Sequence, residues 1–418
     1  MLRHRCLWYH NGASQLRRSG VSVEPKTLAN RLSAASIAWR PGMAMALLMG
    51  YFVLFGMTVG GQGVLWADII HTLRISEGAF GSVQLLPPLI AMGLLVLGGP
   101  LTVRFGKKRL AITGLIVLGL SLLGLAATSD FLSFSIALAL SGLGFGAVEM
   151  AMNSATLDWE QQTQRPVMNL MHAGFSGGAV TGAFAAGGLL QAGWVYAHVL
   201  WLLAAFCAIA LLSTLPVHYP PAAPTHTTHN GSGAALRLLI DRRALLAFAV
   251  LSMFGVVGES VANTWSVIYL RDLGAAAFVG GTAYALFNGT MFVGRLANAP
   301  FVARFGARTS LLTSGTLVII AGLLLIIPDS ISAAVVAFAL AGLGVAGVVP
   351  TALSEAARHA PGSSGAVTGA IMAVTYLSFV VCAPLIGWIA ELVSLQTALL
   401  AVALSGIGIV GLARGIAR

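Results

Sequence analysis

Twelve apolar runs constrain the fold of this chain more than any other feature. Stretches such as Leu110–Thr128 and Leu311–Ile327 contain no charged residue at all. A helix that crosses the roughly 30 Å hydrocarbon core of a bilayer needs about 20 apolar residues, so these runs are long enough to be transmembrane helices. The runs occupy residues 43–67, 79–102, 110–128, 132–156, 168–191, 197–216, 244–270, 277–302, 310–328, 332–354, 366–390 and 396–413.

The composition excludes soluble and disordered chains. Only 9% of the 418 residues are charged and 57% are hydrophobic, whereas an average soluble domain is about 25% charged. A soluble surface needs more charge than this chain contains, and a disordered chain would be poor in apolar residues. We therefore predict an all-α integral membrane protein.

Basic residues are concentrated on one side of the predicted membrane. Of the 23 lysines and arginines, only Arg74 and Arg271 fall in loops of the other side. Cytoplasmic loops of membrane proteins are enriched in lysine and arginine, so we expect both termini and the central linker to be cytoplasmic. The net charge of +10 is then a signal of topology, and we expect no nucleic-acid partner.

The runs divide into six, a polar linker and six more. We predict a basic cytoplasmic tail over residues 1–41, a six-helix bundle over 42–217, a cytoplasmic linker over 218–243 and a second bundle over 244–418. The arginine-rich tail is expected to be disordered. A transit peptide is also typically rich in arginine and serine, and Met43, directly before the first run, leaves a mis-assigned start codon as a further alternative.

The two halves repeat at a nearly constant offset. Pro100–Lys108 aligns with Pro300–Arg308, and Leu140–Gly144 aligns with Leu340–Gly344, each 200 residues on. A third match, in another pair of runs, lies at an offset of 199. Matches in three different runs indicate a duplicated six-helix unit. Parallel six-helix repeats that enclose a site near the bilayer midplane are an architecture of secondary transporters.

The loop between the second and third runs resembles a signature of the major facilitator superfamily. That signature reads Gly-x-x-x-Asp-Arg-x-Gly-x-Arg-Arg, and the segment here is Gly99–Lys108, with Val103 at the position of the acid. The resemblance implies two pseudo-symmetric six-helix bundles, twelve transmembrane helices in all. In that superfamily the acid of the signature helps to hold the two bundles in one state, so this interaction is expected to be weaker or built differently here. The resemblance also implies conformational-switch residues in this loop and in its repeat: Gly99, Arg104, Gly106, Lys107, Lys108, Arg295, Arg304, Gly306 and Arg308.

Three runs resemble a finer group, the fucose-permease-like branch and related uncharacterised bacterial permeases. Gly142–Asn153 is similar to the Gly-Leu-Gly…Glu-Thr-Ala-Ala-Asn of that branch, and Met168–Ser176 resembles its Leu-Asn-Leu-x-Gln-x-x-x-Ser. Glu259–Asp272 looks like the related permeases. The resemblance implies a multi-pass protein of the bacterial inner (plasma) membrane that moves a small-molecule substrate, and it does not fix which substrate.

Two acids, Glu149 and Glu259, lie well inside apolar runs, while the other eleven of the 13 acids fall in tails, loops or span ends. An ionisable side chain at the bilayer centre costs about 2.5–3.5 kcal/mol on insertion scales and normally faces the bundle interior. Glu149 can bind and release a proton as its cavity wets and dries, and the matching glutamate of the branch takes part in proton coupling. A permanently protonated, hydrogen-bonded glutamate is the alternative.

Two further assignments concern proton coupling. Glu259 is expected to carry a proton, to bind substrate or to pair with His172 across the cavity. Asp68 lies near the outer end of the first run, where the branch carries a proton-coupling aspartate, although the spacing to the next motif is shorter here. A structural cap at the end of the helix is the alternative for Asp68.

Polar side chains inside the runs are candidate substrate ligands. An imidazole can donate, accept and relay protons near neutral pH, amides suit a polyol-like ligand, and a tryptophan can stack on a sugar face. Amides also join helices, a lone histidine often only packs, and a tryptophan near a span end fits an aromatic belt. The predicted substrate-binding set is His172, Asn153, Asn169, Asn263, Trp265, Gln62 and Asn288.

No catalytic motif competes with transport. The chain contains neither Gly-x-x-x-x-Gly-Lys-Ser/Thr nor His-Glu-x-x-His, which argues against ATP-driven transport and zinc hydrolysis. We predict no enzyme activity, no cofactor other than a coupling proton and no metal site. The leading prediction is a monomeric secondary transporter in the lipid bilayer that moves a small polar solute, for example a sugar, by proton symport. Proton-coupled efflux of amphipathic compounds and a non-transporting sensor or scaffold are the alternatives.

Overall fold

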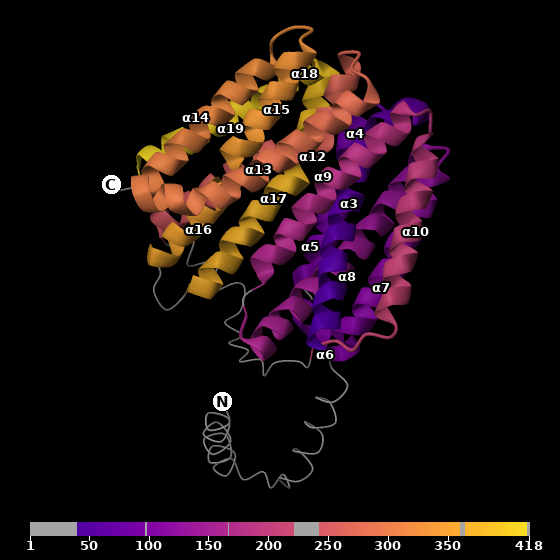
Figure 1. Cartoon of the computed structure of the whole chain (residues 1–418). Helices are drawn as coiled ribbons and strands as arrows, with labels where there is room; N and C mark the ends of the chain where they lie inside the picture. Colours follow the sequence, from indigo (N-terminus) through magenta and orange to yellow (C-terminus); the bar gives the residue numbers. More distant parts are fainter. Residues whose placement is uncertain (1–39, 97, 166, 221–241, 360–363, 416–418) are drawn as a thin grey trace.

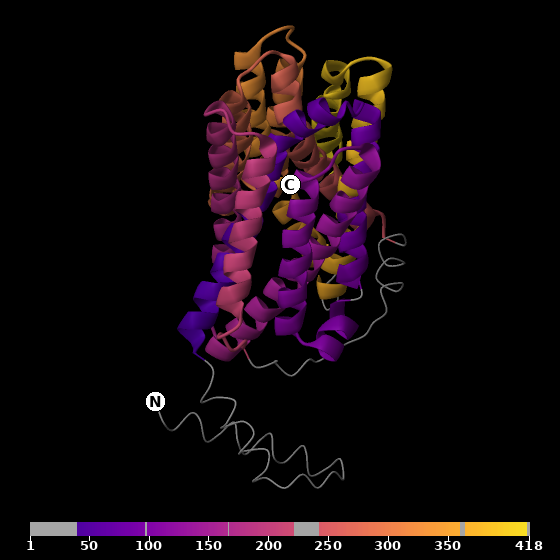
Figure 2. The ribbon, with the colours of Figure 1, turned by 90° about the vertical axis from the view of Figure 1, so that its right-hand side faces the viewer.

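The computed structural model describes residues 40–96, 98–165, 167–220, 242–359 and 364–415. The regular elements in these ranges are all helices, which confirms the prediction of an all-α chain. Figure 1 shows two groups of helices side by side, one from indigo to magenta and the other from orange to yellow. In the view of Figure 2 the helices run alongside one another over the length of the molecule.

The boundaries of the helices follow the predicted runs closely. The N-terminal bundle contains α3 (Pro41–Leu73), α4 (Glu77–Val83), α5 (Leu86–Val96), α6 (Gly98–Phe105), α7 (Lys107–Ala126), α8 (Phe131–Thr163), α9 (Met168–Gln191) and α10 (Tyr196–Thr214). The C-terminal bundle contains α12 (Arg243–Asp272), α13 (Ala277–Phe305), α14 (Ala307–Leu325), α15 (Ile331–Val345), α16 (Val348–His359), α17 (Ser364–Leu392), α18 (Leu395–Ala398) and α19 (Leu400–Arg414).

Ten helical segments of the described chain are long and apolar enough to cross a membrane. The other two predicted spans differ from a simple apolar helix. The run 79–102 is divided into α4, α5 and α6, and Pro87 and Pro88 lie in the first turn of α5, where a residue without an N–H is tolerated. The run 277–302 forms the single helix α13, which contains Arg295 and Pro300 and is therefore less apolar.

The sequence repeat is visible as repeated local geometry. Gly106 and Gly306 precede α7 and α14 with φ angles of 80° and 83°, a backbone conformation that glycine adopts without strain from a Cβ. Asp130 and Ser330 precede α8 and α15, and the side chain of each accepts a hydrogen bond from the backbone N–H three residues on. Such N-caps satisfy amide groups that have no partner inside the helix, so the same devices begin the equivalent helices in both halves.

Close helix contacts also repeat at the offset of 200. A Cβ on Gly142 in α8 would lie 2.6 Å from the Cα of Pro87 in α5, and a Cβ on Gly342 in α15 would lie 2.1 Å from the carbonyl oxygen of Phe287 in α13. Small residues let membrane helices approach this closely. The fourth and second spans of one half therefore pack as the tenth and eighth spans do in the other.

Gly342→Ala is expected to destabilise the protein by about 1–3 kcal/mol, because the new methyl group would meet the backbone of α13. Gly289→Ala is the matched control, since nothing lies within 4 Å of the Cβ position on Gly289, which is also helical. Alanine should there be neutral or stabilising by about 0.5–1 kcal/mol. Thermal unfolding in detergent measures both, and an equal loss in the two variants would contradict the packing argument.

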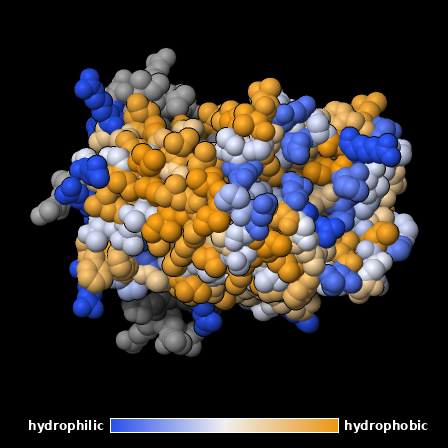
Figure 3. Space-filling view, turned by 90° about the horizontal axis from the view of Figure 1, so that it is seen from above, coloured by the Kyte–Doolittle hydropathy of each residue, from blue (hydrophilic) through white to orange (hydrophobic). Residues whose placement is uncertain are grey.

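The two ends of the bundles differ in charge. We call the end at which α3 begins and α19 ends the basic end, because Arg104, Arg304 and Arg414 lie there, and we call the other the opposite end. Many large hydrophobic side chains on the flanks are exposed, including Leu132 at 69% and Leu404 at 64%. Figure 3, seen from the opposite end, shows broad hydrophobic areas between groups of hydrophilic side chains. The exposed hydrophobic side chains on the flanks suit contact with acyl chains.

At the opposite end the two bundles meet through two glycine crossings. A Cβ on Gly81 in α4 would lie 3.1 Å from the Cα of Gly387 in α17, and a Cβ on Gly187 in α9 would lie 3.5 Å from the Cα of Gly281 in α13. Gly81 and Gly281 are 200 residues apart, as are Gly187 and Gly387. The repeat therefore relates one crossing to the other, and together they bring the two bundles into contact at the opposite end.

Candidate functional site

A carboxylate of one bundle is hydrogen-bonded to the other bundle near the middle of the helices. Glu149 lies 18 residues into α8, and its Oε1 accepts a hydrogen bond of 3.3 Å from the hydroxyl of Tyr376 in α17. Tyr376 also lies in the electrostatic field of Glu259. The two acids that the sequence places inside apolar runs are thus brought near one tyrosine between the bundles.

Glu259 has a basic partner inside the helices. Its Oε2 lies 3.6 Å from a guanidinium nitrogen of Arg295, and the two side chains are 23% and 41% exposed. The sequence assigned Arg295 to a switch loop at the basic end, and that placement is wrong. Arg295 lies within α13, ten residues before its last residue, and faces α12. A charged side chain inside a span normally faces the bundle interior and a partner.

His172 joins this cluster from the N-terminal bundle. It lies in α9, its ring packs edge to face against Phe52 at 5.3 Å between centroids, and the side chain is exposed. The charge of Arg295 acts on His172 electrostatically. Glu259 therefore forms an ion pair with Arg295 instead of the expected pair with His172. Arg295 is the basic neighbour of both Glu259 and His172.

Three buried polar atoms near this cluster have no hydrogen-bond partner in the described part of the chain. They are Nε2 of Gln62, Oδ1 of Asn263 and the hydroxyl of Tyr284, which come from α3, α12 and α13. Asn263 lies one helical turn after Glu259, and Tyr284 lies within reach of the charge of Glu259. Buried polar groups are normally satisfied, so these atoms offer hydrogen bonds to water or to a solute.

The remaining predicted ligands differ in accessibility. Asn153 is half-buried one turn beyond Glu149, whereas Asn288 is buried and donates to the carbonyl oxygen of Tyr284 at 3.1 Å. Trp265 is fully buried and packs edge to face on Phe80 at 5.5 Å, so in this conformation it cannot stack on a solute. The side chain of Asn169 lies outside the described residues.

Asp68 lies away from the central cluster, in an ion pair between the bundles. Its Oδ1 is 3.4 Å from a guanidinium nitrogen of Arg271, which joins α3 to α12 at the opposite end. The carboxylate of Glu391 in α17 accepts hydrogen bonds from the Ser76 hydroxyl at 3.0 Å and the Gly78 N–H at 2.9 Å, at the start of α4. One bundle therefore caps a helix of the other, beside the glycine crossings.

Asp68→Asn is expected to loosen the closure of the opposite end, because it removes the charge that pairs with Arg271. Exposed ion pairs contribute about 0.2–1 kcal/mol, which is at most about a fivefold change in the population of molecules open at that end. A cysteine introduced by Gln62→Cys should therefore react up to about fivefold faster with a membrane-impermeant maleimide added at that end. Combining Asp68→Arg with Arg271→Asp should restore the slow rate. A restored rate without restored proton coupling would instead assign Asp68 the role of a proton carrier.

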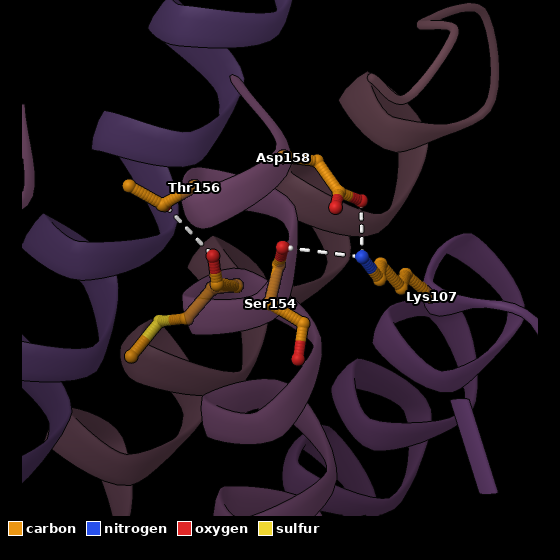
Figure 4. A network of polar contacts seen from close by, with 5 residues as sticks. Lys107, Ser154, Thr156 and Asp158 are labelled. Carbon is orange, nitrogen blue, oxygen red and sulfur yellow. Dashed lines mark hydrogen bonds and ion pairs between the residues drawn. The ribbon is translucent and has the colours of Figure 1, made fainter. Parts of the chain in front are cut away.

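The loop at the basic end of the N-terminal bundle is held by lysines. The Nζ of Lys107 donates to the carbonyl oxygen of Ser154 at 3.2 Å and forms an ion pair with Asp158, both in α8 (Figure 4). The Nζ of Lys108 donates to the carbonyl oxygens of Leu215 and Val217, at 2.7 and 3.0 Å, just after α10. These contacts fix the loop to α8 and to the chain that follows α10, without the acid that the signature expects.

Among the described residues, the repeat of this loop is not held by lysine contacts, since Ala307 and Arg308 stand in place of the two lysines. Arg104 and Arg304 each lie over the ring of the following phenylalanine, at 5.4 and 5.2 Å from the centroid. The Nε of Arg308 is buried and has no hydrogen-bond partner among the residues that the structure describes. The surroundings of Gly99 lie outside the described residues. The switch role of these residues stays a prediction.

The central cluster brings together the kinds of side chain that proton exchange and the binding of a polar solute require. It combines two carboxylates, a guanidinium, an imidazole and free amide and phenol groups, drawn from both bundles. No group of three or more histidine, cysteine, aspartate or glutamate side chains that could hold a metal occurs within the described ranges. Sequence reasoning missed Tyr376 and the position of Arg295, although the predicted run 277–302 already contained an arginine.

A family profile and several similar sequences are described as a transporter family or as transporters. The sequence profile described as Major Facilitator Superfamily matches residues 47–379 and, in a second match, residues 260–416. The chain is 28% identical over 358 residues to the uncharacterized transporter y4wD of Sinorhizobium fredii, covering 82% of this chain and 90% of that protein. It is 24% identical over 237 residues to the cis,cis-muconate transport protein of Acinetobacter baylyi, covering 51% of this chain and 56% of that protein.

A solved structure shares the fold. The crystal structure of the nucleoside transporter NupG matches with a TM-score of 0.75 at 15% sequence identity, over 89% of this chain and 98% of that one. The similar proteins are transporters and not enzymes, as the sequence predicts. The predicted architecture of twelve transmembrane helices in two pseudo-symmetric bundles is confirmed.

Proposed function

The chain belongs to the Major Facilitator Superfamily, and we propose that it moves a small polar solute across the bacterial inner membrane together with protons, by alternating access. The observation that carries the proposal is the contact between Glu149 and Tyr376, which ties an ionisable group inside the membrane to both bundles. A charged carboxylate accepts a hydrogen bond from a hydroxyl more strongly than a protonated carboxyl group does. Protonation therefore weakens this hydrogen bond, so the charge of Glu149 biases how the bundles meet.

Alternating access is supported by where the bundles touch. Hydrogen bonds and ion pairs between described residues of the two bundles lie at the opposite end or near the middle, as with Asp68–Arg271 and Glu149–Tyr376. The lysine contacts at the basic end stay inside one bundle. This arrangement suits a state whose central cluster is reached from the basic end, and we place that end in the cytoplasm because basic loops face it.

Arg295 indicates which solutes suit the cluster. A guanidinium presents five donors in a fixed fork that matches a carboxylate, and its single contact of 3.6 Å with Glu259 leaves most of that fork free. We therefore place solutes with an anionic group ahead of neutral sugars. The name of the cis,cis-muconate transport protein, one of the similar proteins, supports this order, whereas that of the nucleoside transporter NupG supports a neutral solute.

The test has two stages. Purified protein is first screened by thermal shift against pairs of carboxylic acids and their neutral amides, together with sugars and nucleosides. The stabilising solute is then supplied, radiolabelled, to proteoliposomes with an alkaline interior. We expect accumulation above equilibrium that a protonophore abolishes. A solute that binds and equilibrates, yet is never accumulated under the pH gradient, would contradict proton coupling.

A further inference from the structure

A large cavity lies at the basic end of the C-terminal bundle, far from the central cluster. Its volume is about 1040 Å³, and it is bordered by the ends of α12, α13, α14, α16 and α19. Phe248, Leu251 and Leu412 form apolar parts of its wall, while Arg308 and Arg358 supply positive charge. We infer that this cavity binds an anionic phospholipid, with the phosphate of the headgroup at Arg308 and an acyl chain against the apolar wall.

The equivalent place in the N-terminal bundle shows what the cavity lacks. There a cavity of about 520 Å³ is lined by Lys107, Lys108 and Asp158 and by Tyr219 of the chain that follows α10. Lys108 is satisfied by two carbonyl oxygens of that same chain segment. In the N-terminal bundle the protein itself therefore supplies the oxygen atoms that a basic residue needs.

In the C-terminal bundle the basic residue is kept, but among the described residues its Nε has no counterpart of these hydrogen bonds. Arg308 stands 200 residues after Lys108, and its Nε is buried with no hydrogen-bond partner in the described ranges. Arg358 occupies the position equivalent to Asp158, so an acid is replaced by a base. An unsatisfied buried donor on a charged group is costly, and a phosphate oxygen would satisfy it.

The polar groups around the cavity leave an excess of positive charge. Glu355 accepts from Arg358 at 2.8 Å, and its carbonyl oxygen is 2.8 Å from Nδ1 of His359. Arg242 donates to the carbonyl oxygen of His359 at 3.2 Å. Two arginines of the cavity wall, Arg308 and Arg358, thus stand with one carboxylate, that of Glu355. The side chain of Arg358 is 72% exposed, which leaves its other donors free.

Chemistry and position together favour a lipid over a soluble phosphate. The cavity lies at the helix ends, the level of the headgroups, and basic pockets between helices at this level bind acidic lipid headgroups. A soluble phosphate would leave the aromatic and aliphatic wall in contact with water. A phospholipid covers that wall and also supplies the anion.

The experiment compares lipids on purified protein in detergent. Phosphatidylglycerol is expected to raise the melting temperature, while phosphatidylcholine and glycerol 3-phosphate should not. Arg308→Gln should weaken apparent phosphatidylglycerol affinity about five- to tenfold, since an arginine near an anionic headgroup contributes about 1 kcal/mol or more. Arg304→Gln is the control, because Arg304 precedes the cavity and does not line it.

A second variant tests the cavity independently, in case Arg308→Gln does not fold. Ala247→Trp fills the apolar part of the cavity without changing its charge, and should also abolish the phosphatidylglycerol shift. The inference is overturned if Arg308→Gln keeps the full shift, or if Arg304→Gln loses as much. A shift produced by glycerol 3-phosphate alone would assign the cavity to a soluble phosphate compound, and an equal shift with phosphatidylcholine would remove the role of charge.

Discussion

Glu149→Gln is expected to abolish accumulation of solute under a proton gradient while solute exchange across the same membrane continues. Glutamine has nearly the same shape and can still accept the hydrogen bond from Tyr376, but it cannot carry a proton. Gradient-driven uptake should fall at least tenfold, because no other carboxylate of the described chain contacts both bundles at the level of Tyr376. Proteoliposome uptake with a pH gradient, and counterflow without one, measure the two activities separately.

Tyr376→Phe provides the matched control for this prediction. It removes the same interbundle hydrogen bond and leaves the carboxyl of Glu149 in place. Accumulation should persist with a changed dependence on pH, because the carboxyl group loses its hydrogen-bond donor from the other bundle. If Glu149→Gln accumulates solute as the wild type does, Glu149 is a structural residue and the assignment is wrong.

Arg295→Gln is expected to weaken solute binding about 10- to 100-fold, the second large effect. A hydrogen bond to a charged group contributes about 1.5–3 kcal/mol, and each 1.4 kcal/mol is a tenfold change in affinity. Glu259→Gln should have the opposite effect, since it removes the carboxylate that competes for Arg295. Thermal shift or calorimetric titration with the solute found by screening gives both affinities.

Arg295→Lys separates charge from geometry. It keeps the positive charge but loses the planar fork, so an anionic solute that binds through two oxygens should still lose affinity. A neutral solute would respond differently, because Arg295→Gln and Glu259→Gln would then weaken binding by similar, small amounts. That outcome would make a neutral sugar or nucleoside the preferred candidate solute.

The architecture was predictable because it depends on local and repeated signals. The length of the apolar runs predicts the helices. The repeat offset of 200 residues predicts matching geometry, which is found in the φ angles of Gly106 and Gly306 and in the close approaches of Gly142 and Gly342. Such features are fixed by neighbours in the sequence or by the nearest helix. They survive in both halves because each half buries the same helix faces.

The site was only partly predictable, since it depends on contacts between the bundles. Glu149 and Glu259 were identified because a carboxylate inside an apolar run is costly. Tyr376 carries no such cost and gave no signal, and Arg295 was assigned to a loop because its neighbours at the basic end are loop arginines. The glycine crossings were also missed, since four positions are hidden among the 50 glycines of the chain.

Proton symport requires that protons enter with the solute, and their movement can be recorded as a change of external pH. Wild-type protein is reconstituted into weakly buffered proteoliposomes with the membrane potential clamped, and the external pH is recorded as solute is added. For proton symport we expect an immediate alkalinisation that a protonophore removes and that Glu149→Gln lacks. Entry of labelled solute with no change of external pH in the wild type would contradict it.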